Sequence, residues 1–491
     1  MRLIINADVE KNQISKYIYG HFSEHLGRCI YGGVYVGNDP EIPNIEGLRT
    51  DVIEALKQIR IPVLRWPGGC FADDYHWQDG IGPKDQRPSM VNKNWGGVTE
   101  DNSFGTHEFL RFCELIGAEP YINGNVGSGT VREMRDWVEY MTFDGVSPMA
   151  DQRRANGQEE PWKVQFFGIG NEAWGCGGNM RPEYYADEFR KFNTYLYNYG
   201  DNKLFRIASG ASDNDYNWTR TLMDRIGRRM DGIAVHHYSV AGTWAHKGSA
   251  LDFNEDEWAA SMKSSWWMDE LITNHSAIMD EFDPEKKIWL IVDEWGNWHD
   301  VEEGTNPGFL YQQNSVRDAV VAGMILNIFN NHSDRVRMAN IAQMVNVLQS
   351  VILTEGTAMV KTPTYHVFDM YKDHQNATRV DASEIDVPEY IHGDIAIPAV
   401  TSSVSKQADG TLLVTFSNAD PNTSQKIMID VRGKFVGSVE GLVLTGEAMN
   451  AANTFDAPET VQPVPFMDFV LEDSVIKAEL PARSVVSLTI R

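Results

Sequence analysis

Short apolar runs of strand length alternate with helix-like stretches along most of the chain. The runs are rich in β-branched and aromatic residues and show little polar alternation, which is typical of strands buried on both faces. Eight such strands are expected at residues 17–22, 63–66, 120–123, 164–169, 205–209, 232–236, 288–292 and 337–342. Helical periodicity lies between them, for example at 49–59, 105–116, 182–199, 218–228 and 315–331. Strand followed by helix, repeated along the chain, predicts an α/β fold of the (β/α)8 TIM-barrel type.

After about residue 371 the pattern changes to short strands separated by turns rich in Gly, Pro, Asn and Asp. Strands are expected at 395–404, 412–417, 425–431, 438–444 and 484–490. This spacing predicts a C-terminal all-β sandwich. The strand-like segment 3–7 precedes the first barrel strand, and we expect it to join the sandwich. The predicted division is therefore an N-terminal strand at 1–14, the (β/α)8 barrel at 15–370 and the sandwich at 371–491.

Length and charge narrow the class of protein. A chain of 491 residues accommodates a barrel of ~250 residues or more together with a smaller module. Its 43 basic and 69 acidic residues give a net charge of −26. Such a surface repels nucleic acid and anionic lipid and favours neutral ligands. We therefore expect neither nucleic acid nor a membrane among its partners.

Cysteine usage and the N-terminus indicate a compartment. The four cysteines have spacings that form neither a disulfide framework nor a zinc pattern: Cys29, Cys70, Cys113 and Cys176. No run approaches the ~20 apolar residues of a membrane span, and the first apolar core is too short for a secretion signal. We expect a soluble cytoplasmic protein whose thiols stay reduced.

Two glutamates stand where buried strands are expected to end. Glu172 follows the run 164–170, and Glu294 follows the run 288–293; Trp and Gly come close behind each. The carboxyl ends of the strands form the active-site face of a (β/α)8 barrel. Acidic residues also begin helices there, so a single such glutamate is better explained as part of a cap. Two in the same local setting favour the acid/base and nucleophile pair of a glycoside hydrolase.

Other polar side chains are expected at the same barrel mouth. Sugar hydroxyls need paired donors and acceptors, and sugar C–H faces stack on aromatic rings. Arg65 and Tyr238 offer a cation and a hydrogen-bond donor that would hold a nearby Glu294 ionised. Glu172, beside Ala173 and Trp174, would keep its proton more easily if these neighbours exclude water. Each residue alone also has a structural reading as a packing or capping residue.

Several polar and aromatic segments occur in a fixed order along the predicted barrel. They are residues 21–33, 64–71, 75–77, 82–88, 170–172, 293–295 and 342–347. Together they resemble the glycoside hydrolase family 51 α-L-arabinofuranosidases. The resemblance covers the whole barrel and, more loosely, the sandwich.

The resemblance implies an activity and a set of site residues. It implies exo-acting release of terminal non-reducing α-L-arabinofuranosyl units from arabinoxylan, arabinan and derived oligosaccharides by double displacement, as in hemicellulose breakdown. Glu172 would be the acid/base, Glu294 the nucleophile and Arg65 its neighbour. The pocket for the terminal furanose would be lined by Glu24, Cys70, Asn171, His236, Tyr238 and Gln343. A homohexamer without metal or organic cofactor is implied as well. Residues 173–180 vary among family members and border the leaving group, so the preferred linkage and aglycone stay open.

Three alternatives belong to other classes of protein or substrate. His21, Glu24 and His25 match the H-x-x-E-H zinc pattern, but that motif needs an uninterrupted helix and glycines follow closely. His236 and His237 are an equally weak metal signal, because neighbours on a predicted strand should point to opposite faces. A non-catalytic carbohydrate-binding protein would share the aromatic and amide residues without needing both glutamates. β-Xylosidase or endoglucanase activity is also compatible, since a fold and a carboxylate pair do not fix the sugar.

Overall fold

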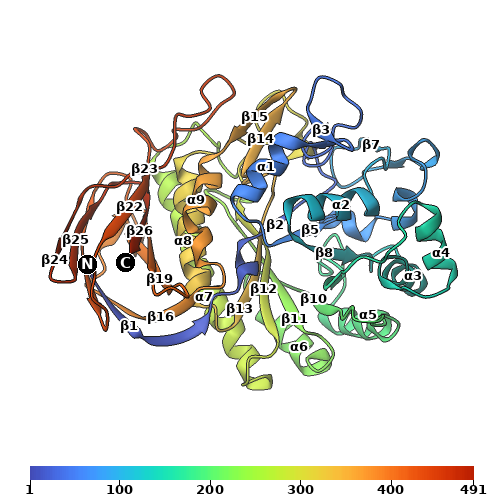
Figure 1. Ribbon diagram of the computed structural model, residues 1–491, viewed down its shortest axis with the longest axis horizontal. Coiled ribbons are helices and arrows are strands. Elements are labelled where there is room, and N and C mark those ends of the chain that lie inside the picture. The colour runs from blue at the N-terminus through green and yellow to red at the C-terminus, as the bar shows by residue number, and fades with distance from the viewer.

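The computed structural model describes all residues from Met1 to Arg491, and its larger part is a closed barrel of eight parallel strands (Figure 1). In barrel order the strands are β2 (Gly20–Phe22), β5 (Val63–Trp66), β8 (Glu119–Gly124), β9 (Phe166–Ile169), β10 (Phe205–Ser212), β11 (Gly232–Ser239), β12 (Trp289–Asn297) and β13 (Val336–Ile341). All eight overlap the predicted strands, and the predicted (β/α)8 barrel is confirmed. The expected first strand is too long, because a 3-10 helix, η1 (Lys16–Tyr19), occupies its first half. The Ser15 side chain accepts the Tyr17 N–H and so begins that helical turn.

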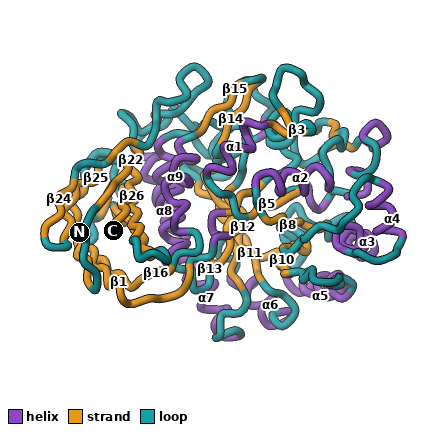
Figure 2. Tube along the Cα trace, viewed as in Figure 1, coloured by secondary structure: helices purple, strands orange, loops and turns teal.

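Helices surround the barrel on the outside, as Figure 2 shows (Figure 2). They are α1 (Thr50–Gln58), α2 (Thr106–Ile116), α3 (Val131–Thr142), α4 (Pro148–Ala155), α5 (Pro182–Thr194), α6 (Tyr216–Ile226), α7 (Glu255–Phe282) and α8 (Val316–Asn331). The five expected helices are confirmed, although α5 ends at Thr194 rather than at residue 199. The long α7 fills the interval between the sixth and seventh expected strands, and polar Ser261, Ser265 and His275 interrupt the apolar stripe of its buried face. No helix of the protein has the length and apolar character needed to span a bilayer.

The smaller part is a β-sandwich made from one ten-stranded sheet that curls over itself (Figure 1). Its strands, in sheet order, are β23 (Val464–Pro465), β22 (Val439–Leu444), β26 (Ser484–Ile490), β20 (Leu412–Asn418), β19 (Val400–Lys406), β16 (Thr378–Ile385), β1 (Arg2–Gln13), β21 (Gln425–Arg432), β25 (Val475–Leu480) and β24 (Phe469–Glu472). The N-terminal β1 lies inside this sheet, antiparallel to β16 and parallel to β21. The predicted sandwich is confirmed. The expected strand 395–404 is in fact two strands, with a break at Ala399.

Short hairpins and one more helix complete the chain. The hairpins pair β3 (Asn44–Ile45) with β4 (Leu48–Arg49), β6 (Met90–Val91) with β7 (Thr99–Glu100), β14 (Ile352–Glu355) with β15 (Ala358–Lys361), and β17 (Glu389–His392) with β18 (Ile395–Pro398). Helix α9 (Pro363–Tyr371) leads from the barrel into the sandwich, and short 3-10 helices lie in the loops, among them η2 (Cys70–Asp73).

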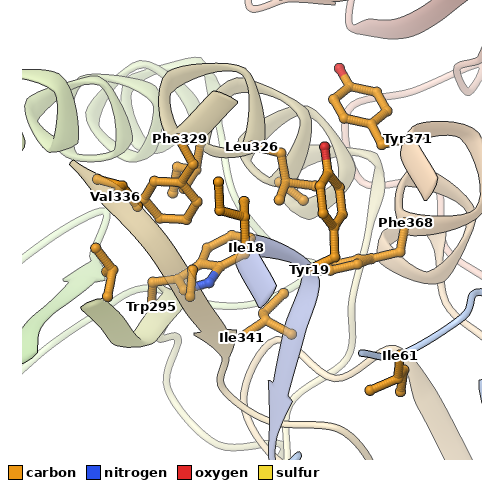
Figure 3. Close-up of a cluster of buried hydrophobic side chains, with 14 of the residues drawn as sticks. Ile18, Tyr19, Ile61, Trp295, Leu326, Phe329, Val336, Ile341, Phe368 and Tyr371 are labelled. Carbon is orange, nitrogen blue, oxygen red and sulfur yellow. The ribbon is translucent and has the colours of Figure 1, made fainter. Parts of the chain in front are cut away.

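Helix α8 lies between the barrel and the sandwich and is buried along nearly its whole length. Its apolar side chains meet those of β12, β13 and α9 in one cluster, shown in Figure 3 (Figure 3). Trp295 of β12 packs edge-to-face against Phe329 of α8, with ring centroids 5.4 Å apart. Because Trp295 directly follows Glu294, this packing fixes the segment of β12 that carries the glutamate.

Candidate active site

The two glutamates lie at the carboxyl ends of β9 and β12 and face each other across the barrel mouth. One carboxylate oxygen of Glu172 lies within 4.8 Å of one of Glu294. His236, from β11, lies between them: its Nδ1 is 2.9 Å from Glu172 and 3.6 Å from Glu294. The structure thus brings together residues that are 122 positions apart in the chain (294 − 172).

In the segment around Asp293, strand β12 carries one extra residue relative to both of its neighbours. Between paired positions, β12 advances three residues while β11 and β13 each advance two. Such a bulge interrupts the alternation of side chains, so consecutive residues can point to the same side. Asp293 and Glu294 both project into the barrel for this reason, and both contact Arg65.

Glu294 is held by two donors. The Arg65 guanidinium donates to its Oε1 at 2.9 Å, and the Tyr238 hydroxyl donates to its Oε2 at 2.7 Å. Arg65 also donates to the side-chain oxygen of Asn171, the residue that precedes Glu172. One buried guanidinium therefore orients a carboxylate at β12 and an amide at β9. Gly69 lies so close that a Cβ there would be 2.8 Å from Glu294 Oε1.

Glu172 lies in a different environment. Its Oε1 accepts from His236, and its backbone adopts the left-handed conformation, with φ of 37°. Burial raises the pKa of the Glu172 carboxyl, and the hydrogen bond from His236 opposes this, while the negative charge of Glu294 adds to it. A carboxyl that keeps its proton can act as a general acid.

His236 bridges three carboxylates. Its Nε2 is 3.1 Å from Asp293, on the side opposite Glu172. Burial disfavours the charged imidazole, but Glu294, Asp293 and Glu172 outweigh that penalty and raise the pKa of His236 to about 10. We infer that this ring is protonated at neutral pH. His237, by contrast, points away toward Asp213 and the Ser264 carbonyl, as expected for its neighbour on a strand.

Glu24 and Gln343 line the same mouth and are bonded to each other. Glu24 accepts from the backbone N–H groups of Gly69 and Phe71, from the Trp95 indole, and from the Gln343 amide at 2.9 Å. Burial raises the pKa of Glu24 to about 7, and the charge of Glu294 contributes. The Gln343 side-chain oxygen is buried without a partner in the protein.

These residues enclose a cavity of about 70 Å³ at the barrel mouth. Its polar lining contains six of the nine residues expected at the site: Glu24, Cys70, Glu172, Tyr238, Glu294 and Gln343. Of the other three, Arg65 contacts Glu294, His236 contacts Glu172, and Asn171 accepts a hydrogen bond from Arg65. Apolar walls come from Leu26, Gly69, Trp95, Trp298, Leu310 and Leu348.

Sequence reasoning missed several contributors to this site. Asp293 was missed because strand alternation places it outside when Glu294 is inside, and the bulge cancels that rule. Tyr121, which donates to Asp293 at 2.7 Å, gave no signal because an isolated buried tyrosine usually belongs to the core. Trp95 and Trp298 lie on loops, and only the abundance of tryptophan in the chain hinted at them.

Two cysteines of the site form a disulfide, so the expectation of four reduced thiols is wrong for them. Cys70, after β5, is bonded to Cys176, after β9, with the Cα atoms 5.4 Å apart. Their separation of 106 residues gave no hint of pairing, because only the closed barrel brings the two loops together. Cys29 and Cys113 are free and buried.

The arrangement of potential metal ligands favours proton transfer over cation binding. Cys70 and Cys176 cluster with Glu172, but the disulfide leaves no thiolate to bind a metal. His236 clusters with both glutamates, but its two ring nitrogens are engaged by carboxylates and its protonated form has no free lone pair. Residues 21–25 form a strand end and a turn rather than a helix, so the H-x-x-E-H pattern lacks the geometry of a zinc motif.

Comparisons with known proteins agree with this geometry. The family model described as "Alpha-L-arabinofuranosidase 1 domain" matches residues 55–256, and "Alpha-L-arabinofuranosidase C-terminal domain" matches residues 293–484. The chain is 52% identical over 489 residues to an "Intracellular exo-alpha-L-arabinofuranosidase" of Bacteroides ovatus, covering 100% of this chain and 95% of that one. It is 31% identical to "Alpha-L-arabinofuranosidase C" of Emericella nidulans, covering 90% and 89%.

Solved structures give the same result. The GH51 arabinofuranosidase of Xanthomonas axonopodis pv. citri superposes with a TM-score of 0.98 at 48% identity, covering 100% of this chain and 99% of that one. An α-L-arabinofuranosidase of Thermotoga maritima, solved as an arabinose complex, superposes with a TM-score of 0.88 at 31% identity, covering 99% of each. The chain belongs to the glycoside hydrolase family 51 α-L-arabinofuranosidases.

Proposed function

We propose that this exo-acting arabinofuranosidase removes terminal non-reducing α-L-arabinofuranosyl units from arabinoxylan, arabinan and their oligosaccharides by double displacement. The observation that carries the proposal is the placement of Glu172 and Glu294, with oxygens within 4.8 Å of each other at a narrow, polar barrel mouth. Retaining enzymes have carboxyl groups ~5–5.5 Å apart, whereas inverting enzymes leave room for a water at ~6.5–9.5 Å. The geometry favours retention.

The first step would break the glycosidic bond. Glu294, oriented by Arg65 and Tyr238, attacks the anomeric carbon and forms a covalent bond to the sugar. Glu172, whose raised pKa favours the protonated form, gives its proton to the departing oxygen. The leaving group departs as a neutral alcohol.

The second step would release arabinose. Glu172, now ionised, removes a proton from water, and the resulting hydroxide attacks the anomeric carbon and displaces Glu294. Two inversions give net retention. His236 donates to Glu172 from its fixed position between the carboxylates, and so stabilises the ionised state that the acid/base reaches after the first step.

The terminal furanose would be recognised by hydrogen bonds. We propose that Glu24, Asn171 and Gln343 bind its hydroxyls, with Cys70 and Tyr238 contacting the ring or neighbouring groups. The places of Glu24 and Gln343 in the cavity lining, beside both glutamates, support this assignment. A cavity as small as this one favours a single terminal sugar over the interior of a chain.

A panel of aryl glycosides tests the substrate class. We expect turnover of p-nitrophenyl α-L-arabinofuranoside to exceed turnover of the β-D-xyloside and β-D-glucoside, and release of arabinose from arabinoxylan and arabinan. Faster turnover of the β-D-glucoside would overturn the proposal. The relative rates on the two polymers would define the linkage preference.

We also propose three properties of the whole chain. Residues 15–370 form the catalytic barrel, residues 371–491 form the sandwich, and the N-terminal strand at 1–14 joins the sandwich. The chain assembles as a homo-oligomer, a hexamer by family resemblance, which light scattering would test; a monomeric mass would contradict it. It acts in the cytoplasm, as the word "Intracellular" in the name of the Bacteroides ovatus relative suggests; recovery from the periplasmic fraction of its host would contradict this.

A further inference from the structure

Glu172 has a backbone conformation that its own sequence does not favour. Its φ of 37° lies in the left-handed region, where a side chain beyond Gly, Asn or Asp is uncommon. Such a conformation persists only where the surrounding structure imposes it. The contacts on either side of Glu172 show what imposes it here.

Asp73, at the end of η2, holds the residue before Glu172. It is buried, and its Oδ2 accepts the Asn171 N–H at 2.8 Å. Its Oδ1 accepts two further backbone N–H groups from the loop after β8, those of Val126 at 2.7 Å and Gly127 at 2.8 Å. One carboxylate thus joins the loops that follow β5, β8 and β9.

Ser209 of β10 holds the residue after Glu172. Its hydroxyl accepts the Ala173 N–H at 3.1 Å. Ser209 is itself fixed, because its own N–H donates to the Tyr185 hydroxyl and its carbonyl accepts the Trp218 indole N–H. The backbone N–H groups of the residues before and after Glu172 are therefore each bound by a buried side chain from another part of the barrel.

We propose that Asp73 and Ser209 are positioning residues that together hold Glu172 in its left-handed conformation and aim its carboxyl at the leaving group. Neither side chain lines the cavity, so neither is a catalytic residue. Gly177 supports the arrangement, since a Cβ there would lie 1.7 Å from the Asn171 carbonyl and 2.8 Å from Asp73 Oδ2. The inference rests on the proposed acid/base role of Glu172.

Asp73→Asn is the sharpest test because it keeps the shape of the side chain. With the amide oxygen toward Val126 and Gly127, the NH2 group faces the Asn171 N–H, donor against donor. Proton donation matters for a poor leaving group and little for nitrophenolate. We expect kcat/KM on methyl α-L-arabinofuranoside to fall ~10–100-fold, part of the ~10²–10⁴-fold that general acid catalysis supplies, and on the nitrophenyl substrate several-fold at most.

A second readout separates positioning from a general loss of structure. Azide attacks the glycosyl-enzyme without a base, so it should raise the kcat of Asp73→Asn on the nitrophenyl substrate. Ser209→Ala removes the other acceptor with a smaller change, and should show the same dependence on leaving group. Asp231→Asn is the matched control, because Asp231 accepts the Arg206 N–H at 2.8 Å at the opposite end of the barrel. For Asp231→Asn, kcat/KM should change by the same factor on the methyl and the nitrophenyl substrate.

The outcomes distinguish this inference from the proposed function. In one outcome, Glu172→Ala shows the leaving-group dependence while Asp73→Asn and Ser209→Ala lower kcat/KM equally on both substrates. In that case the positioning role is wrong and the catalytic assignment stands. If Asp73→Asn does not fold, an unchanged substrate ratio in Ser209→Ala overturns the inference. If Glu172→Ala itself lacks the dependence, the proposed function fails first.

Discussion

Arg65 is the residue whose replacement should disturb the site most broadly. It is buried, 1% exposed, and donates to Glu294, to Asn171 and to the Asp293 carbonyl. Its guanidinium also lies over the Phe22 ring, 4.5 Å from the centroid. Arg65→Met would keep much of the stem volume but would remove the guanidinium from the buried Asp293 and Glu294 carboxylates, leaving the His236 imidazolium as the cation beside them.

The magnitude follows from that loss. Removing one partner of a buried ion pair costs about 3–5 kcal/mol, because the remaining charge is left uncompensated. The Asn171 oxygen loses its donor as well, but contacts within one network do not add. We expect the free energy of unfolding to fall by about 4 kcal/mol. Since a displacement of ~1 Å can cost ~10²-fold in rate, kcat/KM should fall by at least that factor.

Urea denaturation followed by tryptophan fluorescence, with kcat/KM on the nitrophenyl substrate, measures both effects. Arg65→Lys keeps the charge but lacks the planar guanidinium that donates to two acceptors at once. Its unfolding free energy and its kcat/KM should therefore lie between those of wild type and Arg65→Met. Arg335→Met is the control: Arg335 is also 1% exposed and donates to Asp283 at 2.8 Å, just before β13 at the other end of the barrel. It should lose comparable stability and keep its activity. A loss below about 1 kcal/mol in Arg65→Met, or equal loss of activity in Arg335→Met, would refute the reasoning.

Three further predictions concern single features of the site. The folded-state pKa of His236, about 10, exceeds the ordinary value of 6.5, so its stabilising contribution is complete below pH 6.5 and is lost as pH rises toward 10. In this window the unfolding free energy of wild type should fall with rising pH, with a slope up to about 1.4 kcal/mol per pH unit steeper than that of His236→Asn. Equal slopes in the two proteins would contradict the assignment. Cys176→Ser opens a loop of 106 residues and should lower stability by up to about 4–5 kcal/mol, as should dithiothreitol on wild type; insensitivity of wild type to the reductant would argue against the disulfide. Gly69→Ala should lower activity because its Cβ would press on Glu294, whereas Gly175→Ala, with nothing closer than 3.7 Å, should not; equal activities would show that Gly69 has room.

Much of the barrel could be predicted because its strands are buried on both faces. An apolar run such as 288–292 has no solvent-facing side, so composition alone reveals it. The approximate position of the site followed, since the ends of such strands share one face. Helix α7 has a weaker pattern, because the serines and the histidine on its buried face pack against other polar groups rather than apolar ones.

The finer structure of the site depends on contacts between distant segments. The bulge in β12 that turns Asp293 inward appears only when three strands are paired. The Cys70–Cys176 bond and the Asp73 contacts join loops about 50 to 100 residues apart, and nothing local marks them. Glu172 and Glu294 could be selected from sequence because each follows a buried apolar run and has Trp and Gly close behind it.

The most direct measurement is the anomeric configuration of the azide product from each glutamate variant. Glu172→Ala should still release nitrophenol, stall at the glycosyl-enzyme, and give the α-configured arabinosyl azide when azide is added, because two inversions have occurred. Glu294→Ala cannot form the covalent intermediate, so direct attack by azide should invert once and give the β-configured product. Nuclear magnetic resonance spectroscopy distinguishes the two. The opposite stereochemistry would exchange the roles, and undiminished hydrolysis of arabinoxylan by either variant would contradict the assignment of a catalytic pair.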